Sequence, residues 1–173
     1  MMNNTKNHTR ATIEEALEIL QGEEGTDVRI AAIGMLAQEA AEGNPPQVAK
    51  AALPHLIGAL RDESKEVRNA STRVLASFGE TALPGLAALL SDQWWVVRYR
   101  ACEALGLMKR PEALPHLSAA LSDEKDHVRY MAAKGLLLLG ISSAVLDLRP
   151  LLEDENPYVR SMAGQAIETL QDT

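Results

Sequence analysis

Residues 113–140 read ALPHLSAALSDEKDHVRYMAAKGLLLLG, and this stretch decides the fold. The leucines of its first half lie at helical spacing: Leu114, Leu117 and Leu121. Small or apolar residues of its second half recur 4, 7, 8 and 11 positions after Val128: Ala132, Gly135, Leu136 and Leu139. Both sets fit a period of 3.6 residues with one apolar stripe. The stretch therefore predicts two short amphipathic helices joined by a loop.

The same pattern recurs along the chain. A Val-Arg pair marks each of five copies: Val28-Arg29, Val67-Arg68, Val97-Arg98, Val128-Arg129 and Val159-Arg160. Successive pairs lie 39, 30, 31 and 31 residues apart. The longer first spacing reflects an insertion at residues 42–50 (EGNPPQVAK), where residues 43–46 predict a break between helices. Gly79 and Gly140 follow apolar stripes and predict left-handed helix ends.

A helix pair of this size cannot bury its apolar stripe alone, whereas stacked pairs bury one another. We therefore predict an all-α fold, an α-solenoid of five helix pairs. The expected pairs cover about residues 12–42, 46–79, 81–109, 112–140 and 142–171. We expect residues 11–173 to form one solenoid, and residues 1–10, which are polar throughout, to form a disordered tail.

The composition of the 173 residues agrees with helices and excludes several functions. The chain has 26 Ala and 25 Leu but only six aromatic residues, which favours helix over strand. Its net charge of −7 disfavours nucleic-acid binding. The single cysteine cannot form an internal disulfide, and the longest apolar run, residues 135–141, is too short to span a membrane. We expect a cytoplasmic protein.

The recurrent arginine has a recurrent acidic partner. In four of the five copies an Asp lies six residues before the Arg. We interpret these residues as a structural ladder in which each Arg bonds an Asp or loop carbonyls of its own or the neighbouring unit. The alternative is a basic track for an anionic ligand. The ladder residues are Asp62, Arg68, Asp92, Arg98, Asp123, Arg129, Asp154 and Arg160.

Five tandem units with the pattern L-x-D-x(4)-V-R-x-x-A-x-x-A-L resemble the short HEAT repeats of phycobilin lyase subunits and many prokaryotic proteins. The resemblance covers about residues 12–171 and implies a solenoid. It also implies one function: a phycobilin-lyase-like subunit or chaperone that assists a tetrapyrrole-bearing or other cofactor-bearing protein. HEAT-type folds include the di-iron deoxyhypusine hydroxylases, whose signature is paired His-Glu motifs. No His-Glu dipeptide occurs in this chain.

The sequence offers no catalytic constellation. It contains no nucleophile elbow, Walker A motif or dinucleotide-binding glycine motif. Cys102 lies beside the apolar stripe of its helix and is expected to pack as a small hydrophobe. We therefore predict a non-enzymatic protein with no metal and no cofactor.

The second helices are expected to line the concave face of the solenoid and to bind another protein. Residues two and six positions after each Val vary from copy to copy, and two tryptophans occupy the third loop. Trp, Tyr and Arg dominate interface energies. The predicted partner-binding residues are Asn69, Arg73, Trp94, Trp95, Tyr99, Arg100, Glu103, Tyr130 and Lys134. The alternatives are an unconstrained solvated face, tryptophans packed over a unit edge, and self-association through the last helix.

Overall fold

A computed structural model describes the backbone of residues 2–42 and 45–172, and the side chains of residues 12–41 and 47–172. Within these ranges the chain is helical and contains no strand. It divides into two compact units, residues 1–82 and residues 83–173. Each unit is described by itself.

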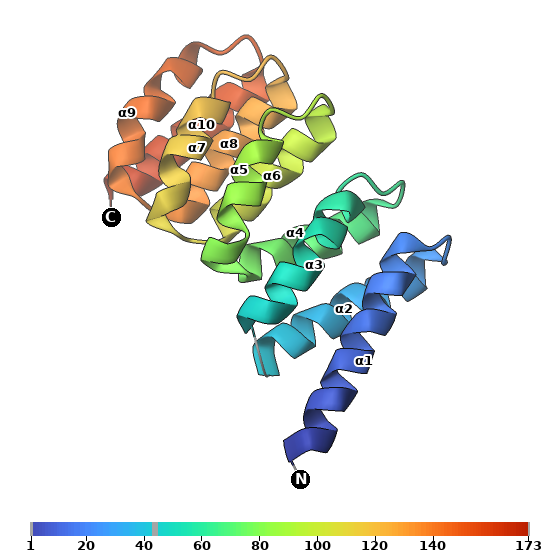
Figure 1. Cartoon of the computed structure of the whole chain (residues 1–173). Coiled ribbons are helices and arrows are strands. Elements are labelled where there is room, and N and C mark those ends of the chain that lie inside the picture. Colours follow the sequence, from blue (N-terminus) through green and yellow to red (C-terminus); the bar gives the residue numbers. More distant parts are fainter. Residues whose placement is uncertain (1, 43–44, 173) are drawn as a thin grey trace. The chain divides into compact units, whose positions relative to one another are not determined.

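The first compact unit contains two helix pairs (Figure 1). Its elements are α1 (Met2–Gln21), α2 (Thr26–Glu42), α3 (Pro45–Ala59), α4 (Lys65–Ser77) and the 3₁₀ turn η1 (Gly79–Thr81). α1 packs on α2 and α3 packs on α4, while α1 also contacts α3 and α2 contacts α4. The unit thus has one layer of first helices and one layer of second helices.

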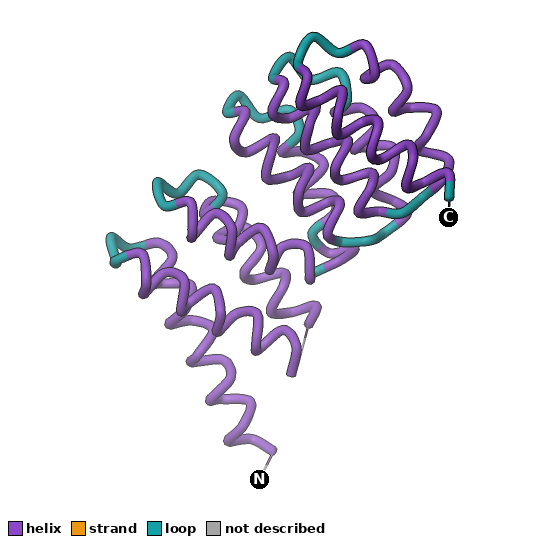
Figure 2. The backbone as a smooth tube through the Cα atoms, turned by 180° about the vertical axis from the view of Figure 1, so that it is seen from behind, coloured by secondary structure: helices purple, strands orange, loops and turns teal. Residues whose placement is uncertain are grey.

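The second compact unit contains three further pairs. Its elements are α5 (Leu83–Leu89), α6 (Trp95–Leu107), η2 (Pro111–Ala113), α7 (Leu114–Ala120), α8 (Asp126–Leu139), η3 (Ser142–Ala144), α9 (Val145–Leu148), η4 (Arg149–Glu153) and α10 (Pro157–Gln171). The second helices form a layer in which α8 packs against both α6 and α10, and α5, α7 and α9 cover it. Figure 2 shows the loops within these pairs gathered at one end of the unit. The predicted all-α solenoid of five helix pairs is confirmed.

The N-terminal segment is helical in the structure, whereas the insertion lies at a boundary between two helices. α1 begins at Met2, so residues 2–10 are helical where the sequence predicts a disordered tail. This segment has neither Pro nor Gly, and the helix of residues 12–21 extends backwards through it. At the insertion α2 ends at Glu42 and α3 begins at Pro45, while Gly43 and Asn44 of the predicted break lie outside the described residues.

The core follows the repeated apolar positions. In α6 the stripe residues Ala101, Ala104 and Leu105 are fully buried. Small residues let the second helices approach closely: a Cβ added at Gly106 of α6 would lie 2.6 Å from the Cα of Gly135 in α8. Such a distance leaves no room for a methyl group, so this crossing requires glycine.

Two of the helix ends adopt the predicted left-handed conformation. Gly79 has a φ of 54° after α4, and Gly140 has a φ of 74° as the C-cap of α8. After α6, Lys109 adopts the same conformation with a φ of 52°. A non-glycine residue is strained there because its Cβ crowds the following carbonyl.

Candidate protein-binding surface

Two arginines of the ladder, Arg98 and Arg129, link one helix pair to the next. Arg98 donates from Nε to Oδ2 of Asp123 at 2.7 Å and from Nη2 to Oδ1 at 2.9 Å. Its Nη1 donates to the backbone carbonyl of Asp92 in its own loop at 2.8 Å. The side chains of Arg98 and Asp123 are 8 % and 9 % exposed, so the pair is shielded from water. Each pair formed by an arginine and the Asp side chain of the next helix pair is called a rung below.

A second rung in the same unit repeats this geometry, and an ion pair in the first unit joins Arg29 to Asp62. Arg129 donates to the two carboxylate oxygens of Asp154 at 2.7 and 3.0 Å, and Arg29 lies 3.0 Å from Asp62 in the first unit. The Arg129 guanidinium lowers the pKa of Asp154 below its ordinary value, chiefly through these hydrogen bonds. Arg68 and Arg160 donate to carbonyls of their own loops. These contacts direct the guanidinium groups at the protein's own carbonyls and carboxylates.

The aromatic side chains gather at the N-terminal turns of α6, α8 and α10. Trp94 is 53 % exposed, Trp95 is 37 % exposed and Tyr158 is 75 % exposed, whereas Tyr99 and Tyr130 are half-buried. Trp94 is the N-cap of α6 and Trp95 is its first residue. We call these five residues the aromatic patch.

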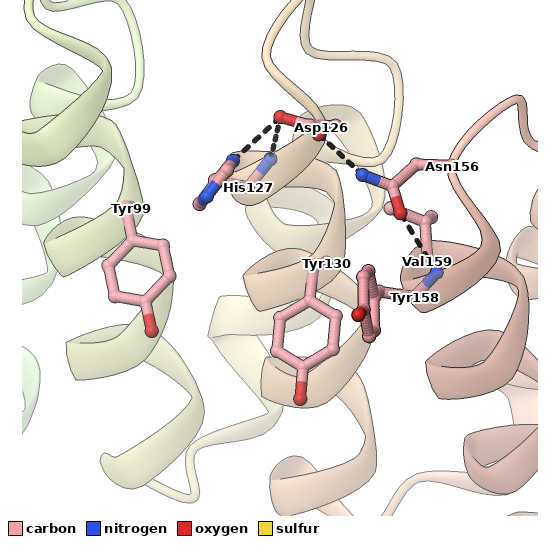
Figure 3. Close-up of a pocket in the computed structure, with 7 residues that line it drawn as sticks. All are labelled: Tyr99, Asp126, His127, Tyr130, Asn156, Tyr158 and Val159. Atoms are coloured by element: carbon pink, nitrogen blue, oxygen red, sulfur yellow. Dashed lines mark hydrogen bonds and ion pairs between the residues drawn. The ribbon is translucent and has the colours of Figure 1, made fainter.

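Part of the aromatic patch forms a pocket of about 260 Å³, shown in Figure 3 and called the tyrosine pocket below. Tyr99 of α6 stands on one side, and Tyr130 of α8 and Tyr158 of α10 lie on the other. The remaining lining residues come from the first turn of α8 and the start of α10: Asp126, His127, Asn156 and Val159. Three successive second helices therefore contribute to one pocket.

Hydrogen bonds fix the only carboxylate that lines the pocket. Oδ1 of Asp126 accepts from the backbone N–H of His127 at 2.8 Å and lies 2.7 Å from its Nδ1. Oδ2 accepts from the side-chain amide of Asn156, which joins α8 to α10. The side-chain hydrogen bonds from His127 and Asn156 lower the pKa of Asp126 to about 2, so the carboxylate is ionised at neutral pH.

The tryptophan of the third pair adjoins the pocket through ring contacts. The ring centroids of Trp95 and His127 are 5.0 Å apart, with the planes tilted by 54°. Nζ of Lys125 lies 5.5 Å from the Trp95 ring centroid, within the range of a cation–π contact. These contacts connect Trp95 of α6 with the first turn of α8.

Only some of the predicted partner-binding residues belong to the aromatic patch. Trp94, Trp95, Tyr99 and Tyr130 belong to the aromatic patch, as does Tyr158, which the sequence analysis did not select. Asn69 is half-buried and Arg73 exposed on α4 of the first unit. Glu103 and Lys134 are half-buried on α6 and α8.

Arg100 corrects the prediction, because its side chain does not lie on the surface. It is buried, with 7 % of the residue exposed, and Nη1 bonds Oε2 of Glu103 at 2.6 Å. Its guanidinium carbon lies 5.4 Å from the centroid of the Tyr99 ring. Arg98, two residues earlier, is likewise buried, in its rung with Asp123. A partner cannot reach these two guanidinium groups directly.

The pocket residues that sequence reasoning missed share one signal. Asp126 and His127 lie just before Val128 of the fourth copy, and Asn156 and Tyr158 lie just before Val159 of the fifth. These positions begin the second helix of each pair. These residues can be found from the sequence if the first positions of each second helix are considered together with the positions two and six residues after the Val.

Cys102, the one cysteine of the chain, is buried in α6. Burial raises the pKa of the Cys102 thiol to about 12, which keeps it protonated. Within the part of the chain that the structure describes, no three His, Cys, Asp or Glu residues could hold a metal ion together. None of the described helices has the length and hydrophobicity to cross a bilayer.

The repeated helix pairs, constant rungs and layered second helices define a helical-repeat protein. The family profile for HEAT repeats matches residues 13–106 and 83–168. The chain belongs to the HEAT-repeat family. No curated protein sequence gives a significant match.

Solved structures share the fold at low sequence identity. A chain of the complex of CpcE and CpcF of phycocyanin lyase from Nostoc sp. PCC7120 is 24% identical, with a TM-score of 0.62 over 93% of this chain. The present chain spans 65% of the length of that one. Human deoxyhypusine hydroxylase in complex with glycerol is 20% identical, with a TM-score of 0.57 and coverage of 93% and 74%. A designed armadillo repeat protein in complex with the peptide (KR)4 is 21% identical, with a TM-score of 0.55 and coverage of 90% and 80%.

Proposed function

We propose that this HEAT-repeat protein is a non-enzymatic scaffold that binds a partner protein across the second helices α6, α8 and α10. One observation carries the proposal. Five of the six aromatic residues of the chain form the aromatic patch, where they are exposed or half-buried. Aromatic side chains contribute most of the binding energy in many interfaces, and here they are not used in the core.

The similar folds support the same proposal. The armadillo repeat protein binds a peptide, and the phycocyanin lyase chain is seen in a complex of two proteins. Both are solenoid-type neighbours of this chain, with TM-scores of 0.55 and 0.62. Surfaces built from successive repeats suit extended partners, because each repeat adds one further contact position.

The test compares two chains that differ only at the aromatic patch. Wild-type protein and a Trp94→Ala/Trp95→Ala/Tyr158→Ala variant are used as baits in lysate of the native organism, with identification by mass spectrometry. Each captured protein is then purified and titrated by calorimetry. We expect the variant to lose at least about 2 kcal/mol of affinity, the threshold for a hot spot, with unchanged helicity. Equal affinity for both baits would contradict the proposal.

The likeness to a phycocyanin lyase chain favours a second candidate, a subunit that assists a tetrapyrrole-bearing or other cofactor-bearing protein. The test is a titration of the protein with a free bilin, followed by absorption spectroscopy. A saturable spectral shift that the aromatic-patch variant loses would support this function. A spectrum unchanged by the protein would count against it.

A further inference from the structure

The tyrosine pocket has a chemistry that selects among ligands. Its walls present three phenol rings, and the negative face of an aromatic ring attracts a cation. Among its seven lining residues Asp126 supplies the one carboxylate, and Oδ1 of this carboxylate lies 2.7 Å from Nδ1 of His127. Neither Lys nor Arg lines it.

We propose that the tyrosine pocket receives a lysine or arginine side chain from an extended basic segment of the partner protein, an inference that rests on the proposed protein-binding function. The cation would lie among the rings of Tyr99, Tyr130 and Tyr158 and be attracted by Asp126. Aromatic rings and a fixed carboxylate are the two groups that recognise alkylammonium and guanidinium ions.

The surroundings of the pocket already hold cations in this way. Arg100 lies against the Tyr99 ring and Lys125 against the Trp95 ring. Each is also next to a carboxylate, since Arg100 bonds Glu103 and Lys125 Nζ lies 3.8 Å from Asp126. The face therefore combines rings and carboxylates at distances suited to basic side chains.

Exposed carboxylates extend this character along the loops. The side chains of Glu124 and Glu155 are 86 % and 84 % exposed, and they lie two residues before Asp126 and one residue before Asn156. Each contacts a rung arginine with one oxygen and remains open to solvent. They provide negative charge beside the pocket for the neighbouring residues of a basic segment.

The pocket volume argues for one side chain. Sites for drug-sized ligands measure about 300–1,000 Å³, and this pocket measures about 260 Å³. Neither Lys nor Arg lines the pocket to receive an anionic ligand, since Lys125, whose Nζ lies 3.8 Å from Asp126, contacts the Trp95 ring and is not among the lining residues. The cationic side chain is therefore the guest that satisfies both the size and the charge of the site.

The experiment titrates the full chain with a fluorescent (Lys-Arg)4 peptide at low salt and follows anisotropy and the NMR signals of the tyrosine rings. We expect saturable binding that shifts the ring signals of Tyr99, Tyr130 and Tyr158. Asp126→Asn should weaken binding about tenfold, because the charged partner of the cation is lost. Glu168→Gln is the matched control, since it removes one exposed carboxylate from α10 far from the pocket.

A pair of substitutions at Tyr158 separates ring from hydroxyl. The side chain is largely exposed, so neither substitution should affect folding. Tyr158→Phe keeps the ring and should bind like wild type, whereas Tyr158→Leu should weaken binding severalfold. If Phe and Leu have equal effects, a cation–π contact is not responsible.

Three results would overturn the pocket assignment: no binding tighter than about 1 mM, equal weakening by Asp126→Asn and Glu168→Gln, or tyrosine shifts produced by a (Glu-Asp)4 peptide. Failure of the pocket assignment can be distinguished from failure of the proposed protein-binding function. A captured partner that depends on the aromatic patch but is unaffected by Asp126→Asn and by excess (Lys-Arg)4 would retain the scaffold and remove the basic segment.

Discussion

The third helix pair, α5 and α6, and the fourth pair, α7 and α8, have the same frame and different surfaces. Arg98 and Arg129 make equivalent rungs, and both first helices have seven residues. The second helix starts differently, with Trp94 and Trp95 in one pair and Lys125 and Asp126 in the other. The comparison shows that the residue type is constant where one helix pair contacts the next. At the first turn of each second helix the residue type varies, so this position can carry binding residues.

Breaking the shared rungs should give the largest effect. Arg98→Ala and Arg129→Ala should each lower the free energy of unfolding by about 3 kcal/mol, because each leaves a shielded carboxylate without its guanidinium partner. Urea denaturation followed by circular dichroism measures this loss. Arg160→Ala is the control: the residue is exposed, and a loss below about 1 kcal/mol is expected. Similar small losses at all three positions would contradict a stabilising ladder.

The crossing of the two second helices is the next most sensitive feature. Gly106→Ala should destabilise the chain by about 2 kcal/mol, since the new methyl group meets the Gly135 backbone. Thermal unfolding gives the comparison with Gly164→Ala in α10, where the nearest atom would be 3.9 Å away. That control should be neutral or stabilising by up to about 1 kcal/mol. If Gly106→Ala instead stabilised the chain, α6 and α8 would be able to move apart without a loss in the free energy of unfolding.

The ends of α6 and α8 should respond in opposite directions. Lys109→Gly should raise the free energy of unfolding by about 1 kcal/mol because it relieves a left-handed residue of its Cβ, and Gly140→Ala should lower it by about the same amount. The two variants are measured in parallel by chemical denaturation. Changes of the same sign would show that backbone strain does not distinguish these ends.

Mild acid should give the smallest effect. The folded pKa of Asp154 is lowered, so its stabilising contribution is complete above its ordinary pKa near 4 and is lost as pH falls through the folded value. Between pH 7 and about pH 5 this contribution should therefore stay constant. Denaturation curves of wild type and Asp154→Asn at each pH test this, and their difference should shrink below about pH 4. A difference that is constant down to acid pH would contradict the assignment.

The sequence predicts the fold well because the apolar residues that pack between helices recur at the same positions of every repeat. It could not identify the carboxylate partner of each rung. Asp123 lies six residues before Arg129 and 25 residues after Arg98, and both separations recur in a repeat of 31 residues. Only the structure shows that the carboxylate binds the arginine of the preceding pair, while its backbone carbonyl binds the arginine of its own pair.

The tyrosine pocket was predictable only in part. Periodicity places Tyr99 and Tyr130 at equivalent positions of α6 and α8. The contact between Asp126 and Asn156 joins residues 30 apart, and it depends on how the loop before α10 turns. Spacing does place Glu103 beside Arg100 on α6, but it does not show that the Arg100 guanidinium is buried near the Tyr99 ring. Local spacing carries little information about such contacts.

The rungs have a consequence for how the second unit opens. Arg98 holds the carboxylate of Asp123, whose carbonyl accepts from Arg129, and Arg129 holds Asp154, whose carbonyl accepts from Arg160. Opening any loop in this series removes an acceptor from the pairs on both sides. We therefore expect local unfolding to be coupled between neighbours, so that the backbone amides of α6, α8 and α10 exchange as one cooperative unit instead of three independent ones.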